Sequence, residues 1–522
     1  MRILFTTQAT SLRVFDEVRA ALEQKTHVER VGYTVADSMF YRQWLRERPR
    51  FESGGHLILK EWEVTARRHG KPDLDLLARY ERKVGAEAGL FGAIVADRRL
   101  FMGPDCTYTQ DYRRRFTDDE LLRILQEGLL ATERLFDTLK PDVVVGFICV
   151  TFLEYLAYLF ARSRGVRVLN LRPTRIADRV IFGSALNDPA PEFLHAYRRA
   201  HLDGSPCMDD ARGYISRVRT EHGRYEGVVP PSARPALVVN PRQQSAWTAA
   251  LRIIRNYREY RHSAARADNH VPDPLRSLMF AAIVNPTRAW ITARQLGARY
   301  VSEEHLQVSR YVFYPLHTEP EVSLLVYGRP FLNQIEVIRQ IAISLPIGMQ
   351  LVVKEHPWMV GKRTPSFYRK LLNIPRVHLA RPEMAARDLI SHASLVAVIT
   401  GSVALEAVML EKPVITFGDC PFNALPPTMV RRCADLRELP SLLATMLDEH
   451  RHDEAALQAY VAAVFELSES VNLYSVLLEK KGVHVERPAA AARAEEIEKL
   501  ADYALACMRN VAMPVEPAAA AW

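Results

Sequence analysis

The sequence predicts an α/β fold in which two doubly wound units of parallel strands follow one another along the chain. Apolar strand-like segments alternate with amphipathic helix-like segments up to about residue 190, and again from about residue 306. A mostly helical stretch separates the two, and 522 residues are more than one ordinary core accommodates. Strands that alternate with helices favour right-handed crossovers, and hence parallel sheets.

In the first unit, short apolar runs predict strands and 3.6-residue periodicity predicts helices. The expected strands are Arg2–Thr7, Val28–Thr34, Asp142–Phe147 and Val166–Leu171. The expected helices are Leu12–Gln24, Leu121–Leu139 and Phe152–Ser163. Thr117 and Glu120 precede the second of these helices at the spacing of a capping box.

The second unit shows the alternation more clearly. Its expected strands are Tyr311–Leu316, Gln350–Glu355, Val377–Ala380, Leu395–Thr400 and Pro413–Phe417. Its expected helices are Leu332–Ser344, Pro365–Leu372, Ala385–His392 and Val403–Leu410. Five strands with four intervening helices predict a doubly wound, Rossmann-like domain.

These patterns predict five segments along the chain. Residues 1–190 form the first domain, 191–305 a mostly helical basic insertion or linker, 306–438 the second domain, 439–487 C-terminal helices, and 488–522 a peripheral helix and tail. No repeat of short period is present.

Composition and charge narrow the class of protein. The net charge of +8 is a mild basic excess, which favours a phosphate-bearing substrate or an anionic membrane surface without establishing either. Nucleic-acid binding is disfavoured because no recognition module accompanies this charge. The six cysteines have neither CxxC nor zinc-finger spacing, and the N-terminus lacks a secretory apolar region. We therefore expect a cytoplasmic protein.

One apolar segment, residues 143–160, has the length of a membrane span. Its first half is β-branched and its second half has helical spacing, so a strand, a turn and a buried helix explain it better. In the helical stretch, residues 251–300 hold nine arginines against three acidic residues, and Arg252, Arg255, Arg258 and Arg261 recur every third position. This pattern is typical of a solvated helix face, or of a face that contacts the inner-membrane surface or an anionic glycan.

Several catalytic signatures are absent, among them GxxxxGK[ST], HExxH and GxSxG. What remains is a set of three polar turns, each directly after an expected strand of the second domain. Because ligands bind at the carboxyl ends of strands in doubly wound sheets, the three turns predict one binding crevice.

The first turn contains Lys354, His356 and Pro357. The proline fixes the turn, the imidazole can donate to a phosphate or protonate a leaving group, and the lysine supplies positive charge. The alternative is a histidine that merely closes a turn.

The second turn, Gly401-Ser402, begins a helix that carries Glu406. Backbone N–H groups and a hydroxyl suit a phosphate, and Glu406 can reach a ribose hydroxyl; the alternative is a serine N-cap with a supporting glutamate.

The third turn contains His317, Glu319 and Glu321. These residues can supply a general base or a carboxylate nucleophile near a sugar carbon. The alternative is a polar loop with capping carboxylates.

The same residues carry a family resemblance. The strings YPLHTEPE, LVVKEHPWMVGKR and VITGSVALEAVMLEKPVITFG resemble the capsule polysaccharide biosynthesis family, which includes bacterial β-Kdo transferases and is similar in layout to GT-B-type enzymes. The resemblance is good across about residues 306–420 and weaker over the N-terminal half, where PDVVVGFICVTFLEYLAYLFARSRGVRVLNLRPTRI is of the same type.

The resemblance implies two Rossmann-like domains that face a cleft, with the donor nucleotide in the C-terminal domain. It implies a CMP-sugar donor such as CMP-Kdo, phosphate contacts from His356, Pro357, Gly401 and Ser402, and support from Lys354 and Glu406. The family carboxylate falls on Glu321 or else on Glu319. Kdo transferases tend to have Gln and Asp in this loop, where this chain has His317 and Glu321, so the donor sugar and the stereochemical course stay open. No cofactor or metal ligand is expected. Arg172, Thr174 and Arg175 follow an N-terminal strand and are candidates for the acceptor side.

We therefore expect a glycosyltransferase of capsule or surface polysaccharide synthesis that acts on a glycan or lipid-linked glycan. A UDP-sugar 2-epimerase, a CDP-polyol phosphotransferase and a non-catalytic glycan-binding or assembly protein remain alternatives.

Overall fold

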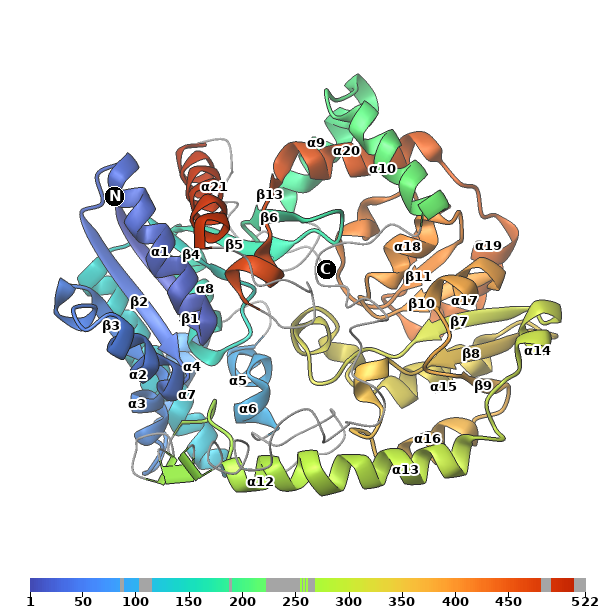
Figure 1. The fold of residues 1–522 in the computed structure, drawn as a ribbon, viewed down its shortest axis with the longest axis horizontal. Coiled ribbons are helices and arrows are strands. Elements are labelled where there is room, and N and C mark those ends of the chain that lie inside the picture. Colours follow the sequence, from blue (N-terminus) through green and yellow to red (C-terminus); the bar gives the residue numbers. More distant parts are fainter. Residues whose placement is uncertain are drawn as a thin grey trace.

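The computed structural model describes residues 1–84, 89–102, 115–186, 190–221, 254–255, 257–258, 260–261, 268–479 and 490–510. Two β-sheets lie side by side in it, one in each half of the molecule, and helices flank both (Figure 1). Helices on both faces of mostly parallel sheets make this the α/β fold that the alternation of strands and helices predicts.

The N-terminal sheet has a parallel core in the order β3-β2-β1-β4-β5, and the antiparallel strands β6 and β13 extend it beyond β5. Its strands are β1 (Arg2–Gln8), β2 (Arg30–Ala36), β3 (Leu57–Lys60), β4 (Val143–Phe147), β5 (Arg167–Pro173), β6 (Arg179–Gly183) and β13 (Glu469–Ser470).

Both faces of this sheet are covered by apolar packing. Successive strand residues point to opposite faces, and both sets are buried. Ile3 and Phe5 of β1 join one apolar cluster, whereas Leu4 between them joins another. The helices of this unit are α1 (Thr10–Lys25), α2 (Ser38–Glu47), α3 (Glu61–Ala66), α4 (Leu74–Val84), α5 (Gly92–Ala96), α6 (Arg98–Phe101), α7 (Asp118–Leu139) and α8 (Phe152–Ser163), with the 3₁₀ turn η1 (Glu52–Gly54).

The C-terminal sheet is entirely parallel, in the order β9-β8-β7-β10-β11-β12. Numbered from its first strand this is the order 3-2-1-4-5-6 of a Rossmann domain. Its strands are β7 (Tyr311–Pro315), β8 (Gln350–Lys354), β9 (Val377–Ala380), β10 (Leu395–Val398), β11 (Val414–Thr416) and β12 (Val430–Arg432).

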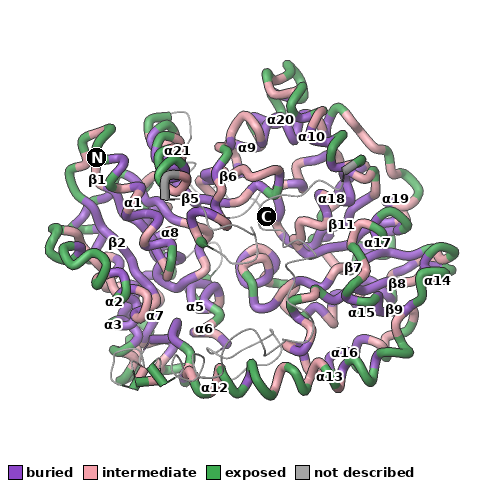
Figure 2. Tube along the Cα trace, in the orientation of Figure 1, coloured by how far each residue is buried: buried purple, intermediate pink, exposed green. Residues whose placement is uncertain are grey.

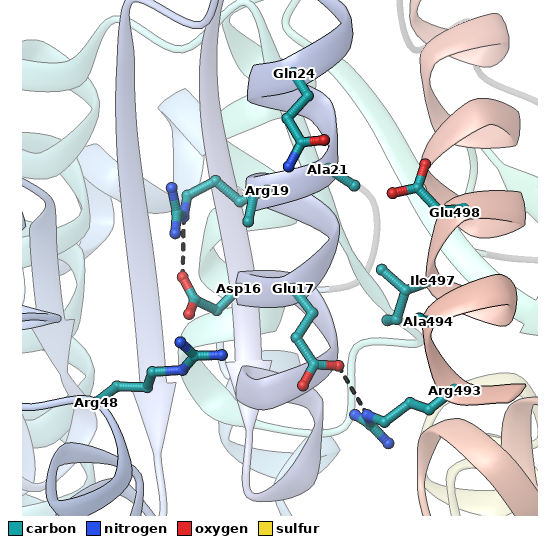
Figure 3. Close-up of a pocket in the computed structure, with 11 residues that line it drawn as sticks. Asp16, Glu17, Arg19, Ala21, Gln24, Arg48, Arg493, Ala494, Ile497 and Glu498 are labelled. Carbon is teal, nitrogen blue, oxygen red and sulfur yellow. Dashed lines mark hydrogen bonds and ion pairs between the residues drawn. The ribbon is translucent and has the colours of Figure 1, made fainter. Parts of the chain in front are cut away.

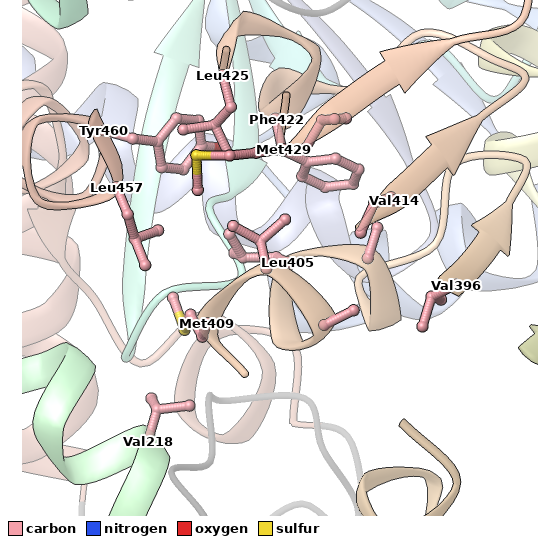
Figure 4. Close-up of a cluster of buried hydrophobic side chains, with 14 of the residues drawn as sticks. Val218, Val396, Leu405, Met409, Val414, Phe422, Leu425, Met429, Leu457 and Tyr460 are labelled. Carbon is pink, nitrogen blue, oxygen red and sulfur yellow. The ribbon is translucent and has the colours of Figure 1, made fainter. Parts of the chain in front are cut away.

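Helices cover both faces of this sheet too. On one face, Val396 of β10 and Val414 of β11 pack with Leu405, Leu457 and Tyr460 from two helices (Figure 4). The helices of this unit are α14 (Glu303–Val308), α15 (Gln334–Ser344), α16 (Pro365–Leu372), α17 (Ala386–His392), α18 (Val403–Met409), α19 (Leu439–Asp448) and α20 (Glu454–Leu467). Its short turns are η6 (Ser323–Tyr327), η7 (Arg329–Phe331), η8 (Pro357–Met359), η9 (Pro421–Ala424) and η10 (Leu436–Glu438).

Two segments cross between the units. Helices α9 (Pro191–Asp203) and α10 (Met208–Glu221) leave the first unit and pack against α20, in the core of the second. After α20 the chain returns: β13 pairs with β6, η11 (Leu473–Leu477) follows, and α21 (Ala490–Arg509) packs on α1.

The sequence predicts only a peripheral helix over residues 488–522. Instead, Leu500, Ala501 and Ala504 of α21 are fully buried in the N-terminal core. The expected tail, residues 511–522, lies outside the described residues.

A long helical segment links the units along the lower edge of the molecule as seen in Figure 1. It consists of α12 (Pro274–Met279), the π-helix η5 (Phe280–Val284) and α13 (Asn285–Leu296). Of the four arginines spaced by three upstream of it, Arg252 lies outside the described residues, and Arg255, Arg258 and Arg261 are exposed.

The local signals of the sequence are confirmed at several elements. Thr117 and Glu120 form the expected capping box of α7. The apolar residues 143–160 form β4 and the buried helix α8, as the change from β-branched to helical spacing predicts. Among the described residues, no helix is long and apolar enough to cross a membrane.

Candidate functional site

The three polar turns predicted from the sequence lie at one edge of the C-terminal sheet. They follow β7, β8 and β10, which are adjacent and parallel. The strand order reverses between β7 and β10, and such a switch point is where doubly wound sheets bind ligands.

His317 joins the turns that follow β7 and β10. The backbone N–H groups of Ile399 and Thr400 donate to its Nε2, at 3.1 and 3.4 Å. Burial, together with the charges of Arg363 and His356, lowers the pKa of His317 to about 3, so the ring is neutral and accepts at Nε2. We conclude that His317 holds two loops together as a neutral acceptor.

A buried cluster that the sequence analysis did not predict lies against His317. Arg363 is fully buried, and its Nη2 donates to the carbonyl oxygen of His317 at 2.6 Å. Its guanidinium also pairs with two buried carboxylates, with Nη1 3.3 Å from Oε1 of Glu319 and Nε 2.9 Å from Oε2 of Glu355. Arg363 lies within one of the strings that carry the family resemblance, but nothing in the local sequence indicates its burial.

Two uncharged side chains complete this cluster. Gln334 accepts from the N–H of His317 at 2.8 Å and donates to Glu319. Tyr368 donates to Glu355 at 2.8 Å. Burial raises the pKa of Glu355, although Arg363 opposes the rise. Glu319, predicted as a catalytic alternative to Glu321, is therefore placed to position the loop rather than to meet a substrate.

His356 follows the neighbouring strand β8 and is exposed. Its Nδ1 accepts from the N–H of Trp358 at 3.2 Å, and Pro357 begins the 3₁₀ turn η8. Because Nδ1 accepts, the neutral ring carries its proton on Nε2. Lys354 is buried at the end of β8, where its Nζ lies 3.4 Å from the carbonyl oxygen of Glu355.

The turn after β10 packs closely on His317. A Cβ atom on Gly401 would stand 3.0 Å from Cε1 of His317, so the close approach favours glycine. Ser402 precedes α18, but its side chain makes no capping hydrogen bond, and its backbone is already helical. Burial raises the pKa of Glu406, which lies one turn further along this helix.

Glu321 differs from Glu319 because it is exposed. Its Oε2 accepts from the hydroxyl of Ser323 at 3.1 Å. The loop that carries it touches the N-terminal unit, since Nη1 of Arg98 donates to the carbonyl oxygen of Pro320 at 3.0 Å. Burial and the nearby charge of Arg98 lower the pKa of Lys362, so cations from both units lie beside this loop.

The three acceptor-side candidates lie in and after β5. Arg172 is buried and donates to the carbonyl oxygens of Ala185 and Leu186. The hydroxyl of Thr174 donates within its own turn, whereas Arg175 is exposed. Arg172 also stacks over Tyr327 of the C-terminal unit, with 5.9 Å between Cζ and the ring centroid.

The carboxyl edge of the N-terminal sheet holds a second buried cluster, which the sequence did not indicate. Nε2 of His270 lies 2.7 Å from Oε1 of Glu61 and 3.3 Å from Oδ2 of Asp97. Burial and Arg99 lower the pKa of His270, but the two carboxylates outweigh them and raise it to about 10. Asn269 donates to both carboxylates. Glu61 follows β3, a four-residue strand too short to be predicted.

Two groups of the described residues have side chains of metal-ligand type close together. They are Glu61, Asp97 and His270, and Glu411, His452 and Glu454. In each, a protein cation already pairs with the carboxylates: His270, whose pKa is raised to about 10, in the first, and Arg219, 2.7 Å from Glu454, in the second. The absence of a metal cofactor stays a prediction.

A cavity of about 360 Å³ lies elsewhere, between α1 and α21 (Figure 3). Arg19 pairs with Asp16 on one side of it and Arg493 with Glu17 on the other. It shares no residue with the three turns, so the candidate site rests on the strand ends rather than on this cavity.

Comparison with known proteins supports the resemblance seen in the sequence. The family model described as capsule polysaccharide biosynthesis protein matches residues 241–452, a range that contains all three turns. The resemblance to this family is thus confirmed over that part of the chain.

Among curated proteins, Protein FixF of Sinorhizobium fredii (strain NBRC 101917 / NGR234) is 30% identical over 141 residues, which are 26% of this chain and 32% of FixF. The chain therefore spans about a third of the length of this relative.

Two solved structures show only a distant likeness. The KpsC β-Kdo 2,4 transferase of Thermosulfurimonas dismutans is 14% identical, with 69% of this chain and 87% of that chain covered and a TM-score of 0.36. The UDP-GlcNAc 2-epimerase of Neisseria meningitidis is 12% identical, with coverages of 92% and 100% and a TM-score of 0.28. Likenesses this distant carry no argument about activity.

Proposed function

We propose that this protein is a glycosyltransferase of capsule or surface polysaccharide synthesis, which transfers a sugar from a nucleotide donor to a glycan or glycolipid acceptor. The observation that carries the proposal is the junction at the switch point, where His317 joins the turn after β7 to the turn after β10. The match of residues 241–452 to the capsule polysaccharide biosynthesis model supports the same conclusion.

In this proposal the donor phosphate binds beside His356. The Nε2–H of His356 donates to a phosphate oxygen, because Nδ1 already accepts a hydrogen bond from the N–H of Trp358. Backbone groups of Gly401 and Ser402 face the same phosphate, and Lys362 and Arg98 add positive charge from the two units. A CMP-sugar such as CMP-Kdo is the donor we favour.

Glu321 is the carboxylate that we assign to the reacting sugar, as general base or nucleophile. It is the exposed carboxylate of the turn after β7, whereas Glu319 is neutralised by Arg363. Glu319, Glu355 and Arg363 act as positioning residues, since they hold the loop that carries Glu321. In this proposal, the acceptor binds near Arg175, beside the carboxyl end of β5.

A thermal-shift panel with CMP, CDP, UDP and GDP tests the donor site. A ligand that binds the native state raises the melting temperature by mass action. We expect CMP to raise it in the wild type and in the control His69→Ala, whose side chain is exposed, but not in His356→Ala. A shift with UDP instead, together with conversion of a UDP-sugar without an acceptor, would identify an epimerase. A shift with CDP alone would favour a polyol phosphotransferase.

Turnover tests the assignment of Glu321. We expect Glu321→Gln to keep the nucleotide-induced shift and to lose about 10²- to 10⁴-fold in transfer rate, the usual contribution of an acid–base group. If no nucleotide shifts the wild type, and Glu321→Ala cells still make capsule, the protein is a glycan-binding or assembly factor instead.

A further inference from the structure

The helical segment that links the two units has an apolar outer face. Leu275, Leu278, Met279, Ile283 and Trp290 are all exposed, Ile283 to 62% and Trp290 to 65%. Within this segment, no exposed position from 278 to 290 carries a charged side chain. We call these five residues the α12–α13 face. An exposed apolar stripe of this length is unusual on a protein surface and marks a site of interaction.

The opposite side of the same segment is firmly seated. Phe280, Thr292 and Leu296 are buried. Gly361 approaches so closely that a Cβ atom on it would stand 2.6 Å from the carbonyl oxygen of Asn285. The buried and exposed positions recur every three to four residues, as on a helix with one packed face.

Both ends of the segment are tied down. At the start, His270 is held by Glu61 and Asp97 of the N-terminal unit. Near the end, Arg288 donates to the carbonyl oxygen of Lys362 in the C-terminal unit, at 3.1 Å. The outer face is therefore presented by a fixed helix at the edge of the molecule (Figures 1 and 2).

The charged residues of the helical segment itself are all basic, and Asp273, which caps its N-terminus, is the acid next to it in the sequence. Residues 274–299 include Arg276, Arg288, Arg294 and Arg299 and no acidic residue. Arg294 stacks over Trp290, with 6.0 Å between Cζ and the ring centroid. Apolar and tryptophan side chains flanked by arginines suit the boundary between lipid headgroups and acyl chains.

We propose that the α12–α13 face docks the protein on an anionic lipid bilayer, with the helix lying in the plane of the surface. A second copy of the chain fits less well, since residues 274–299 carry four arginines and no acid, so a two-fold contact along this helix would bring mainly like charges together. The proposal is independent of the arginine pattern at Arg252–Arg261, and it rests on the apolar face rather than on charge alone.

Vesicle flotation with the full chain tests this proposal. The probes are vesicles of phosphatidylglycerol and phosphatidylethanolamine, with pure phosphatidylcholine vesicles as the neutral comparison. The variants are the pair Ile283→Ser and Trp290→Ser, and as a matched control the pair Val308→Ser and Ile347→Ser, which removes two other highly exposed apolar side chains.

We expect the wild type and the control pair to float with anionic vesicles and to bind neutral vesicles more weakly. The Ile283 and Trp290 pair should lose about tenfold or more in binding, as expected when the two most exposed apolar side chains of the face are removed. Its melting temperature should not change, because both residues are exposed.

Three results would overturn the proposal. One is a wild type that does not float even at low salt. Another is flotation that survives the Ile283 and Trp290 pair but is lost in Arg255→Gln with Arg258→Gln, which would move the contact to the upstream arginines. The last is a wild-type dimer in light scattering that the serine pair converts to monomer without any flotation, which would make the face a contact between copies.

Discussion

Each of the two sheets has a buried histidine at its carboxyl edge. One of these histidines is neutral and the other is protonated. His317 in the C-terminal unit faces Arg363 and two backbone N–H groups, and is neutral. His270 in the N-terminal unit faces Glu61 and Asp97, and is protonated. Burial lowers the pKa of both rings, so the difference comes entirely from the charged groups that the fold places beside them.

The comparison also separates what the two edges do. At the C-terminal edge, the ion pairs of Arg363 with two carboxylates are buried, whereas His356 and Glu321 are exposed. At the N-terminal edge, the histidine and both carboxylates are buried and pair with one another. The first arrangement leaves groups for a ligand, whereas the second fixes the start of the linking helix.

The largest expected effect is at the arginine of the C-terminal edge. Arg363→Met leaves Glu319 and Glu355 buried without their cation, which should lower the free energy of unfolding by about 3–5 kcal/mol. Denaturant unfolding measures the change. Arg339→Met is the control, because its ion pair with Glu336 is exposed and worth at most about 1 kcal/mol. Equal losses in both variants would show that the buried cluster does not hold the loops.

Next comes the histidine of the N-terminal edge. Removing its charge in His270→Gln should cost about 3 kcal/mol at pH 7, because two carboxylates are left together.

The pH dependence of this effect has a definite sign. The folded pKa of His270 lies above its usual value of 6.5, so its stabilisation is complete below about pH 6.5 and declines as the pH rises toward 10. Unfolding at a series of pH values should therefore show wild type and His270→Gln converging from pH 7 to pH 10, with the exposed His69→Gln parallel to wild type throughout. A constant gap would mean that His270 is neutral.

The smallest effect at pH 7 is expected at His317, and its pH dependence runs the other way. His317→Asn weakens the bonds to Ile399 and Thr400 and should cost about 1–3 kcal/mol. The folded pKa of about 3 lies below 6.5, so the wild type loses stability as the pH falls from 6.5 toward 3, and the variant lacks this loss. The two proteins should converge below pH 6, with the exposed His201→Asn as control. Divergence on acidification would contradict a neutral ring.

Much of the fold could be predicted because its signals are local. The helices Phe152–Ser163 and Pro365–Leu372 have the bounds that periodicity indicates. The turns after β7, β8 and β10 were found because each follows a strongly apolar strand. Strands β3, β6, β12 and β13 were not predicted. Three of them have only four, three and two residues, too few to show a period.

The roles of individual residues in the candidate site were harder to predict from the sequence. Glu319 and Glu321 look alike in the sequence, yet one is buried against Arg363 and the other is exposed. Arg363 lies 44 positions from Glu319, and Glu61 lies 209 positions from His270, so no local pattern links them. The apolar outer face of α12–α13 was likewise hidden, because a periodic apolar stripe indicates a helix but not which side of it is covered.

The sequence by itself determined the two α/β units, most of their elements, and the family pattern across about residues 306–420, because periodicity, capping and motif spacing act over a few residues. Only the tertiary structure decided which charges meet. It made His317 neutral and His270 cationic, and it brought α21 back into the N-terminal core. The physical reason is that burial and Coulomb interactions depend on distance in space, and the residues that set them lie tens to hundreds of positions apart in the chain.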